Sequence, residues 1–452
     1  MDQSAWRNRL GELARQHGVP AASLAVLEDD RVTEVATGVL NVETGVESTP
    51  ESVFQIGSVT KPYTAVLLMQ LVDEGRVALD QKVAELLPEL RLTDPEALEQ
   101  VTVQHLLTHT SGIQGDHFQD TGRGDDALAG YVDSCATLGF SHPVGATMSY
   151  CNTGYVLAGR IVEKLTGLIW DDALRTRLLE PLGAQRTVTL PEEALRYRVA
   201  YGHRDDDGQQ VLTKHWTLPR SMGPAGQICA TAADVVGFAR MHLDGGIGAG
   251  GKRVLSSDAV REMQRPAVVI PDRWTLGTHW SAGWILLDWD DRSVYGHDGN
   301  TIGQSTYLRV VPTAGVAVVL LTNGGRSGDL YHALFPELLE ELCGLSMPEP
   351  LAPPDRPPTV DVDPYIGVYE RVGVRIELEK QAGRLAGRVI ATGPLAALDD
   401  DPVDEIRLTA VSESLFVTRD DDSHTWTPMV FYSLPDGASY LHMGMRATPR
   451  TG

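Results

Sequence analysis

The sequence is poor in cysteine and has no apolar run long enough to cross a bilayer. Its four cysteines, Cys135, Cys151, Cys229 and Cys343, are scattered without disulfide or metal-ligand spacing, which predicts free thiols in a reducing compartment. The longest apolar runs, such as AVLLMQLV and VAVVLL, suit buried helices or strands and exclude a membrane-spanning helix. The stretch MDQSAWRNRLGELARQHG has neither a basic nor an apolar signal region, so we expect a cytoplasmic protein.

Basic residues are also scarce, because 38 lysines and arginines stand against 61 aspartates and glutamates, for a formal charge of -23. This charge would repel a phosphate backbone or an anionic membrane, so neither is expected as a partner. The sequence lacks an H-E-x-x-H motif, clustered cysteines and histidines, and a G-x-S-x-G elbow. The glycine-rich stretch GGIGAGGKR has Arg253 where a phosphate loop needs Ser or Thr. We therefore expect no metal, no cofactor and no hydrolase-type triad.

A chain of 452 residues is too long for one hydrophobic core, and its patterns divide it into two domains. Strand-like runs lie near both ends of the first domain, at 21–39 and 282–323, with helices between them. This order predicts an α+β domain over residues 1–345, in which an antiparallel sheet is flanked by helices and a helical subdomain. We expect the edges of the sheet to come from the two ends of the domain.

Proline concentrates where the first domain ends. Six prolines occur in PEPLAPPDRPP, residues 348–358, which predicts a stiff, extended linker over residues 346–363. Short alternating segments separated by polar or glycine turns follow over residues 364–452. They predict a small antiparallel β-barrel as the C-terminal domain.

Ser58 and Lys61 open an apolar helix predicted over residues 59–75, within FQIGSVTKPYTAVLLMQLV. Ser58 follows a glycine where a strand gives way to this helix, so its hydroxyl would lie at the positive end of the helix dipole. Lys61 lies one turn further on, on the same face. Because burial lowers the pKa of a lysine, its amine could act as a base toward the hydroxyl. A serine N-cap followed by a solvated lysine would explain the same pair.

Two further motifs have ordinary structural explanations when each is taken singly. Tyr150 and Asn152 stand two apart before a predicted helix, as a packed tyrosine beside a helix cap would. His297 and Gly299, in VYGHDGNTIGQSTYLRV, join two strand-like runs, as residues of a polar hairpin would. The glycine would also let the backbone of a ligand approach the strand edge closely.

Together the motifs are more specific than any one of them. S-x-x-K, then Y-x-N 92 residues later, then H-x-G 147 residues beyond that, resembles the serine β-lactamase and penicillin-binding-protein superfamily in type, order and spacing. The stretches LLTHTSGI, at 106–113, and GPAGQICATAADVVGFARMHL, at 223–243, are also similar to that superfamily. The resemblance covers residues 1–345.

The resemblance implies a role for each motif residue. Ser58 would attack a carbonyl carbon and become acylated, with neutral Lys61 taking its proton. Tyr150 would pass a proton to the leaving group and later take one from the second nucleophile. Asn152 would hydrogen-bond the substrate amide and Lys61. The backbone N–H groups of Ser58 and Asn300 would hold the oxyanion.

The H-x-G motif departs from most β-lactamases and D,D-peptidases, which carry a lysine at the position of His297. A histidine is cationic only part of the time near pH 7, so strong β-lactamase activity is not expected. The motif is similar to that of the esterases, aminopeptidases, transacylases and peptide cyclases of the superfamily. His297 and Gly299 would bind the substrate. Arg446 would join them if the C-terminal domain covers the cleft, and the alternative is a solvated arginine.

The C-terminal part, with YIGVYER at 365–371, resembles the lipocalin-like domain of some superfamily members. The whole chain is most similar to the penicillin-binding-protein-type thioesterases, which take a nonribosomal peptide from its carrier-protein thioester and cyclise it head to tail. The predicted partner is therefore a peptidyl thioester on a peptide carrier protein. The alternatives are an esterase, a D-aminopeptidase or D,D-peptidase-type hydrolase, an intermolecular transacylase, and a sensor or structural relative without turnover.

Overall fold

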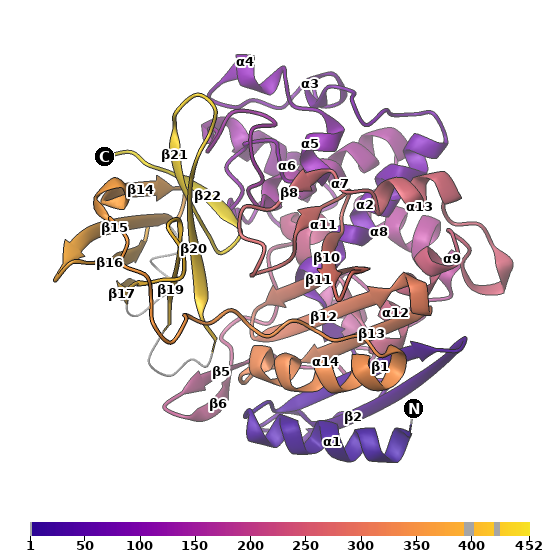
Figure 1. Cartoon of the computed structure of the whole chain (residues 1–452). Coiled ribbons are helices and arrows are strands. Elements are labelled where there is room, and N and C mark those ends of the chain that lie inside the picture. Colours follow the sequence, from indigo (N-terminus) through magenta and orange to yellow (C-terminus); the bar gives the residue numbers. More distant parts are fainter. Residues whose placement is uncertain (1, 393–401, 420–424) are drawn as a thin grey trace.

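The computed structural model describes residues 2–392, 402–419 and 425–452, and its centre is a nine-stranded antiparallel sheet (Figure 1). The strands follow the order β3-β2-β1-β13-β12-β11-β10-β9-β8. Their bounds are β1 Ala21–Glu28, β2 Arg31–Asn41, β3 Val46–Glu47, β8 Val268–Val269, β9 His279–Trp280, β10 Ile285–Trp289, β11 Arg292–Thr301, β12 Gln304–Val311 and β13 Val316–Thr322.

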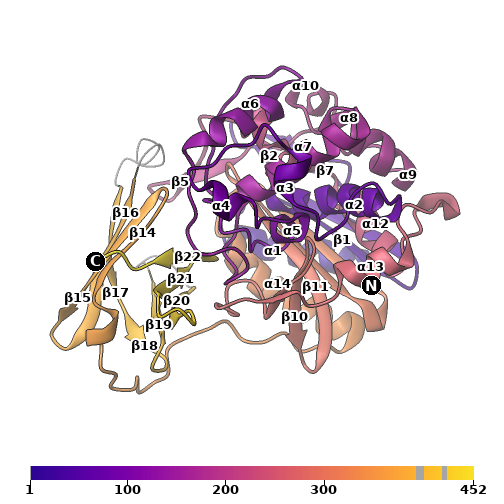
Figure 2. The same cartoon turned by 90° about the horizontal axis from the view of Figure 1, so that it is seen from above.

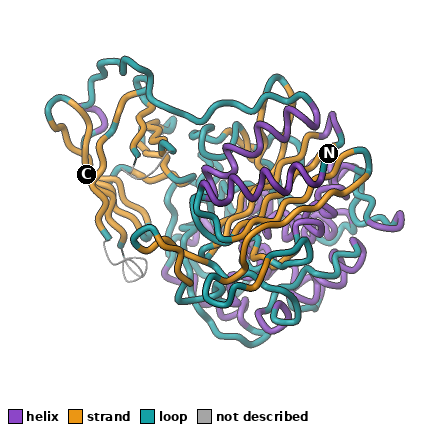
Figure 3. Tube along the Cα trace, turned by 90° about the horizontal axis from the view of Figure 1, so that it is seen from below, coloured by secondary structure: helices purple, strands orange, loops and turns teal. Residues whose placement is uncertain are grey.

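Helices cover both faces of this sheet, and Figure 3 shows long helices crossing one face of the strands. The α-helices are α1 Gln3–Gln16, α2 Thr60–Asp73, α3 Val83–Leu86, α4 Pro95–Leu98, α5 Val103–Leu107, α6 Ala127–Ser134, α7 Asn152–Thr166, α8 Trp170–Leu174, α9 Glu180–Leu182, α10 Pro191–Ala194, α11 Gly223–Gly226, α12 Ala232–Leu243, α13 Ser257–Met263 and α14 Ser327–Cys343. Two short ladders, β4 Phe54–Gln55 with β7 Cys229–Ala230 and β5 His203–Asp206 with β6 Gln209–Leu212, lie outside the main sheet.

Alternation along β1 divides the first domain into two cores. Ala25 and Leu27 belong to the core that contains α2, α7 and α12, whereas Leu24 and Val26 belong to the core beneath α1 and α14. Successive side chains of a strand point to opposite faces, so one apolar strand can serve both cores. The larger core also contains most of the helical subdomain, which stands above the sheet in Figure 1.

The expectation that the ends of the domain supply the edges of the sheet is wrong. β1 and β13 pair with each other in the middle of the sheet, with Ala25 opposite Val319. Both strands are apolar at nearly every position and buried along almost their whole length, as strands covered on both faces are. The edges are instead β3 and β8, which are two residues each and largely exposed.

The C-terminal strands form two small antiparallel sheets, so the predicted fold class is confirmed. One sheet has the order β14-β15-β16-β17 and the other β18-β19-β20-β21-β22. They share a core that includes Ile376, Phe416 and Phe431, and they meet where Tyr369 of β14 bridges to Arg450. Their bounds are β14 Gly367–Arg371, β15 Val374–Gln381, β16 Arg384–Ala391, β17 Val403–Arg407, β18 Thr409–Ala410, β19 Leu415–Thr418, β20 Thr427–Ser433, β21 Ser439–Met443 and β22 Arg446–Pro449.

The C-terminal sheets lie beside the first domain, with β22 nearest to it (Figure 2). Tyr150 N–H donates to the carbonyl of Met445 at 2.9 Å, and Ala447 N–H donates to Ser149 Oγ at 3.1 Å. The end of the chain therefore holds the segment that carries one of the predicted catalytic residues. Within the described residues, no helix is both long and apolar enough to span a membrane.

Candidate active site

Ser58 lies in a single 3-10 turn, Gly57–Val59, between β4 and α2. Gly57 has φ +51°, and a Cβ on it would lie 2.8 Å from the carbonyl oxygen of Asn300. A Cβ on Gly299 would lie 2.0 Å from the carbonyl oxygen of Ile56. Two glycines therefore let the serine turn and β11 approach each other directly.

This arrangement corrects the role expected for Gly299. The backbone that approaches it is the chain's own Ile56–Ser58 segment, because the missing Cβ would also lie 3.1 Å from Ser58 N. Gly299 therefore shapes the site and does not line the cleft, whereas Ser58 and Asn300 both do. The close approach places the two predicted oxyanion donors on adjoining segments.

Lys61 is buried within α2, and its side chain extends to the serine. Its Nζ lies 3.0 Å from Ser58 Oγ and donates to the carbonyl of Ala225 at 2.7 Å. It also lies 4.7 Å from the centre of the Tyr150 ring. Burial, and to a smaller extent the Arg446 guanidinium, lower the pKa of Lys61 well below its ordinary value. The solvated lysine of the alternative explanation is therefore excluded, since the side chain is fully buried.

Tyr150 is 4% exposed and lines the cleft, and the amine of Lys61 lies over its ring. Burial raises the pKa of its phenol, and a hydrogen bond with Ser58 acts in the opposite direction. A phenol that keeps its proton, is hydrogen-bonded to the nucleophile and has the amine over the face of its ring is placed to relay a proton between them.

His297 lies within β11 and not in the turn after it, so the polar-hairpin explanation does not describe it. Its Nδ1–H donates to the carbonyl of Asp298 at 2.6 Å, which leaves Nε2 as an acceptor. Nε2 is buried and has no hydrogen-bond partner among the described residues, although the residue lines the cleft. Burial, and then Lys61, lower the pKa of His297 to about 3. The imidazole is therefore neutral at physiological pH and offers a lone pair, not a cation.

Asn152 opens α7 and lines the cleft, but its expected bond to Lys61 is absent among the described contacts. Its amide nitrogen lies instead 3.4 Å from Asp116 Oδ1. Asp116 is bound by Arg446 Nη2 at 2.7 Å and by Arg371 Nη1 at 2.9 Å. The competing carboxylate explains why the amide turns away from the amine.

Arg446 reaches the cleft from β22, so the solvated arginine of the alternative is excluded. Its guanidinium lies 5.2 Å from the centre of the Tyr150 ring, and its side chain is 18% exposed. Burial alone would raise the pKa of the Asp116 carboxyl, but Arg446 and then Arg371 reverse this and hold it below its ordinary value. In the structure, the anion that Arg446 binds is therefore Asp116.

The cleft in front of Ser58 has a volume of about 490 Å³, and much of its wall is apolar. Phe118 and Met445 contribute from the loop after Asp116 and from the C-terminal domain. The lining residues are Ser58, Phe118, Tyr150, Asn152, Leu218, Met222, Ala225, Gly226, Thr275, Leu276, His297, Asp298, Asn300, Thr301, Tyr307, Met445 and Arg446. A cleft of this volume lies within the ordinary range for ligand-binding pockets.

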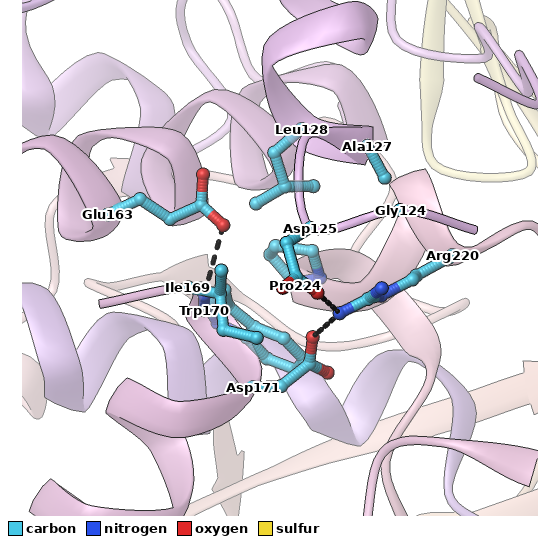
Figure 4. A pocket seen from close by; sticks show the side chains of 10 residues that line it. All are labelled: Gly124, Asp125, Ala127, Leu128, Glu163, Ile169, Trp170, Asp171, Arg220 and Pro224. Carbon is cyan, nitrogen blue, oxygen red and sulfur yellow. Dashed lines mark hydrogen bonds and ion pairs between the residues drawn. The ribbon is translucent and has the colours of Figure 1, made fainter. Parts of the chain in front are cut away.

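A second, smaller hollow lies between α7, α8 and the loop at Asp125 (Figure 4). Arg220 spans it, at 2.9 Å from Asp125 and 3.2 Å from Asp171, and Glu163 accepts from the backbone of Trp170 at 3.0 Å. The charged groups drawn there are already paired, and the hollow holds no nucleophile. Among the residues that the structure describes, no group of acidic, histidine and cysteine side chains is placed to hold a metal ion.

Comparison with known proteins agrees with this geometry. A family described as Beta-lactamase matches residues 6–340. The chain belongs to the beta-lactamase family. Penicillin-binding protein 4 of Amycolatopsis lactamdurans is 52% identical over 375 residues, which cover 82% of this chain and 98% of that protein. Members of this family are serine hydrolases or acyltransferases, and the present chain is an enzyme of that class.

Solved structures extend the similarity to the C-terminal sheets. A crystal structure of SurE has a TM-score of 0.81 at 29% identity and covers 99% of both chains, and one of SurE with D-Leu has a TM-score of 0.77 at the same identity, covering 99% of this chain and 100% of that one. D-amino acid amidase from Ochrobactrum anthropi SV3, complexed with D-phenylalanine, has a TM-score of 0.60 at 25% identity, covering 72% of this chain and 92% of that one. The two-part architecture of this beta-lactamase family member is therefore shared with SurE.

The sequence motifs missed the residues that complete the site. Asp116 and Arg371 lie 255 positions apart in the chain and meet across the two domains. Asp116 follows LLTHTSGI by three positions, but nothing in its own neighbourhood marks it as buried. A lone aspartate in a polar loop gives no signal that a distant domain will enclose it.

Proposed function

We propose that this chain transfers a peptidyl group from a carrier-protein thioester to an amine by way of an acyl-enzyme on Ser58. The observation that carries the proposal is the buried amine of Lys61, 3.0 Å from Ser58 Oγ. With its pKa lowered by burial, the amine can take the serine proton as Oγ attacks the thioester carbon. The C–S bond breaks, and the thiol leaves with a proton that Tyr150 passes on.

Release reverses these roles. The amine at the other end of the peptide attacks the ester carbon, and its proton passes to Tyr150 and on toward Lys61. The C–Oγ bond breaks, and Oγ regains a proton from Lys61, which returns the enzyme to its starting state. The N–H groups of Ser58 and Asn300 would hold the oxyanion in both halves, each lowering the barrier by about 3 kcal/mol. The product is a head-to-tail macrolactam.

The proposed substrate has an apolar, D-configured last residue. Phe118, Met222, Leu276 and Met445 supply apolar wall to the cleft. The similarity to SurE, which has been solved with D-Leu, and to a D-amino acid amidase supports the D configuration. Neutral His297 would accept a hydrogen bond from the substrate, whereas a fixed cation would favour a carboxylate. A carrier protein would deliver the peptide in the cytoplasm, in keeping with the predicted reducing compartment.

Linear peptidyl N-acetylcysteamine thioesters that differ in the chirality of the last residue test the proposal. Intact mass spectrometry is expected to find an acyl adduct on the D-terminated series, followed by a cyclic product of the same mass as the linear peptide minus water. Ser58→Ala should form neither. If the wild-type protein forms no adduct, no cyclic peptide and no free acid, and matches Ser58→Ala, the proposed activity is refuted.

A second candidate is a D-stereospecific hydrolase, favoured by the similarity to the D-amino acid amidase. It would use the same acyl-enzyme, with water in place of the peptide amine. The same incubations separate the two, because hydrolysis adds water and yields the linear acid. A parallel incubation with the peptide loaded on a carrier protein asks whether the carrier raises the rate above that of the small thioester.

A further inference from the structure

His109 belongs to LLTHTSGI, a motif for which the proposed chemistry has no role. The residue is fully buried and has φ +57°, a left-handed conformation that a side chain such as histidine rarely adopts. Such a conformation persists when the surrounding structure requires it, and it is common at functional sites. The contacts of His109 show what requires it here.

The backbone carbonyl and the imidazole of His109 both bind the segment that carries Tyr150. The carbonyl of His109 accepts from the N–H of Ser149 at 2.9 Å, and its ring Nδ1 accepts from the N–H of Cys151 at 2.9 Å. The N–H of Tyr150 itself donates to Met445. Three successive amides are therefore fixed, and His109 fixes the two that flank the tyrosine.

The imidazole is also the surface on which the tyrosine ring rests. The His109 and Tyr150 rings lie 4.3 Å apart, centre to centre, with their planes 30° apart. Trp280 and Tyr155 enclose the histidine at 4.5 Å and 5.1 Å. Both of these residues donate to the carbonyl of Leu107, at 3.2 Å and 2.8 Å, so the enclosure is itself anchored.

The tautomer follows from the same contacts. Because Nδ1 accepts from Cys151, the proton must be on Nε2. In the part of the chain that the structure describes, Nε2 is buried without a conventional hydrogen-bond partner. Burial, followed by Lys61, His297 and Arg446, holds the pKa of His109 well below its ordinary value. The ring therefore stays neutral and keeps the lone pair with which it holds Cys151.

We propose that His109 is a positioning residue that fixes the Tyr150 phenol against Ser58 and Lys61. Its carbonyl and Nδ1 set the backbone on either side of the tyrosine, and its ring sets the plane of the phenol. This inference rests on the proposed acylation of Ser58, not on the fate of the acyl group. It assigns the THTSG stretch, residues 108–112, to the proton relay and not to the core alone.

Two variants separate the contribution of the His109 ring from that of its hydrogen-bond acceptor, and a third variant is a control. His109→Asn keeps a side-chain acceptor and tolerates a left-handed backbone but loses the ring, whereas His109→Phe keeps a ring but leaves Cys151 N–H unpaired. His242→Phe is the matched control, since His242 is also a buried neutral histidine but packs against Phe238 and Trp284, away from Tyr150. Each variant is assayed well below its own melting temperature.

The rate of Ser58 acylation by a D-terminated N-acetylcysteamine thioester, followed by quenched intact mass spectrometry, is the first readout. Both His109 variants are expected to lose about 10²-fold in the acylation rate constant, as a small displacement of a catalytic group does, with little change in substrate affinity. His242→Phe should acylate at the wild-type rate. Wild-type rates in the folded His109 variants, or an equal loss in His242→Phe, would overturn the proposal.

A crystal structure of His109→Asn is the second readout, and it does not depend on activity. The phenol of Tyr150 should move away from Ser58 Oγ, while Lys61 keeps its place. An unmoved phenol would overturn the inference whatever the rates are. If wild-type Ser58 reacts with no thioester, the proposed function fails, and the position of Tyr150 in this variant still decides the role of His109.

Discussion

Lys61 and Asp116 are both ionisable side chains withdrawn from water, yet the structure favours the neutral form of the lysine and the charged form of the aspartate. Lys61 has oxygen atoms of Ser58 and Ala225 as its hydrogen-bond partners, and burial lowers its pKa. Asp116 is held by Arg446 and Arg371, and its pKa falls below the ordinary value in spite of burial. Burial without an opposite charge removes the lysine's charge, whereas burial between two guanidinium groups keeps the carboxylate's.

This difference suits the two sites to different roles, one in the reaction and one in holding the two domains together. A neutral amine can accept a proton, so the uncharged site suits the proposed reaction. Removing one partner from a buried cluster of charges strongly destabilises a protein, so the ionised site is suited to joining the two domains. Arg446 belongs to both, because it pairs with Asp116 and its charge also helps to keep Lys61 neutral.

The largest effect should come from removing the neutral base. Lys61→Met keeps most of the buried volume but leaves Ser58 with no group to take its proton. The rate constant of Ser58 acylation is expected to fall about 10³-fold, as when a general base is removed. Mass spectrometry with a D-terminated thioester measures it, and a loss smaller than tenfold would mean that Lys61 is not the base.

Removing the charge of the other site should cost stability. Asp116→Asn leaves two guanidinium groups buried beside a neutral amide, and the free energy of unfolding in urea is expected to fall by about 3 kcal/mol. Asp258→Asn is the control, because its ion pair with Arg261 is exposed and worth about 1 kcal/mol or less. An equal effect in the two variants would show that the interdomain cluster is no stronger than a surface pair.

The same Lys61→Met variant should be more stable than wild type at pH 7, by about 2 kcal/mol. In the unfolded chain the lysine is protonated, and folding must remove that proton because the folded pKa is lowered. The cost is fully present below the folded pKa, falls as pH rises between the folded and unfolded pKa values, and disappears near 10.5, the ordinary value. Urea unfolding at pH 7 and pH 10 checks this. An advantage that does not shrink with pH would contradict a neutral Lys61.

The smallest effect is expected at His297. His297→Gln keeps an acceptor near Nε2, so acylation should slow only about fivefold, the worth of one hydrogen bond. Since the pKa of His297 is lowered to about 3, the acid limb of the rate profile between about pH 5 and 8 should not move. Profiles of kcat/KM for the two proteins test this, and the disappearance of a limb near pH 6 in the variant would show that His297 titrates there, against its lowered pKa.

Much of the fold was predictable because it depends on local pattern. The strand-like run at 21–39, which contains β1 and most of β2, and the apolar helix after Ser58 follow from the spacing of apolar residues. The position of β1 and β13 in the middle of the sheet was not predictable from their place at the ends of the domain. Pairing between distant strands depends on which buried faces match, and that property belongs to the whole sheet.

Sequence alone determined which residues could do the chemistry, because Ser58 and Lys61 lie one turn apart on an apolar helix and Tyr150 and His297 stand in recognisable motifs. The tertiary structure decided their states. It withdrew Lys61 from water, turned His297 into a neutral acceptor, and placed Arg446 and Arg371 on either side of Asp116. Charge state and contact depend on what surrounds a side chain in space, and the groups that surround these residues come from segments hundreds of positions away.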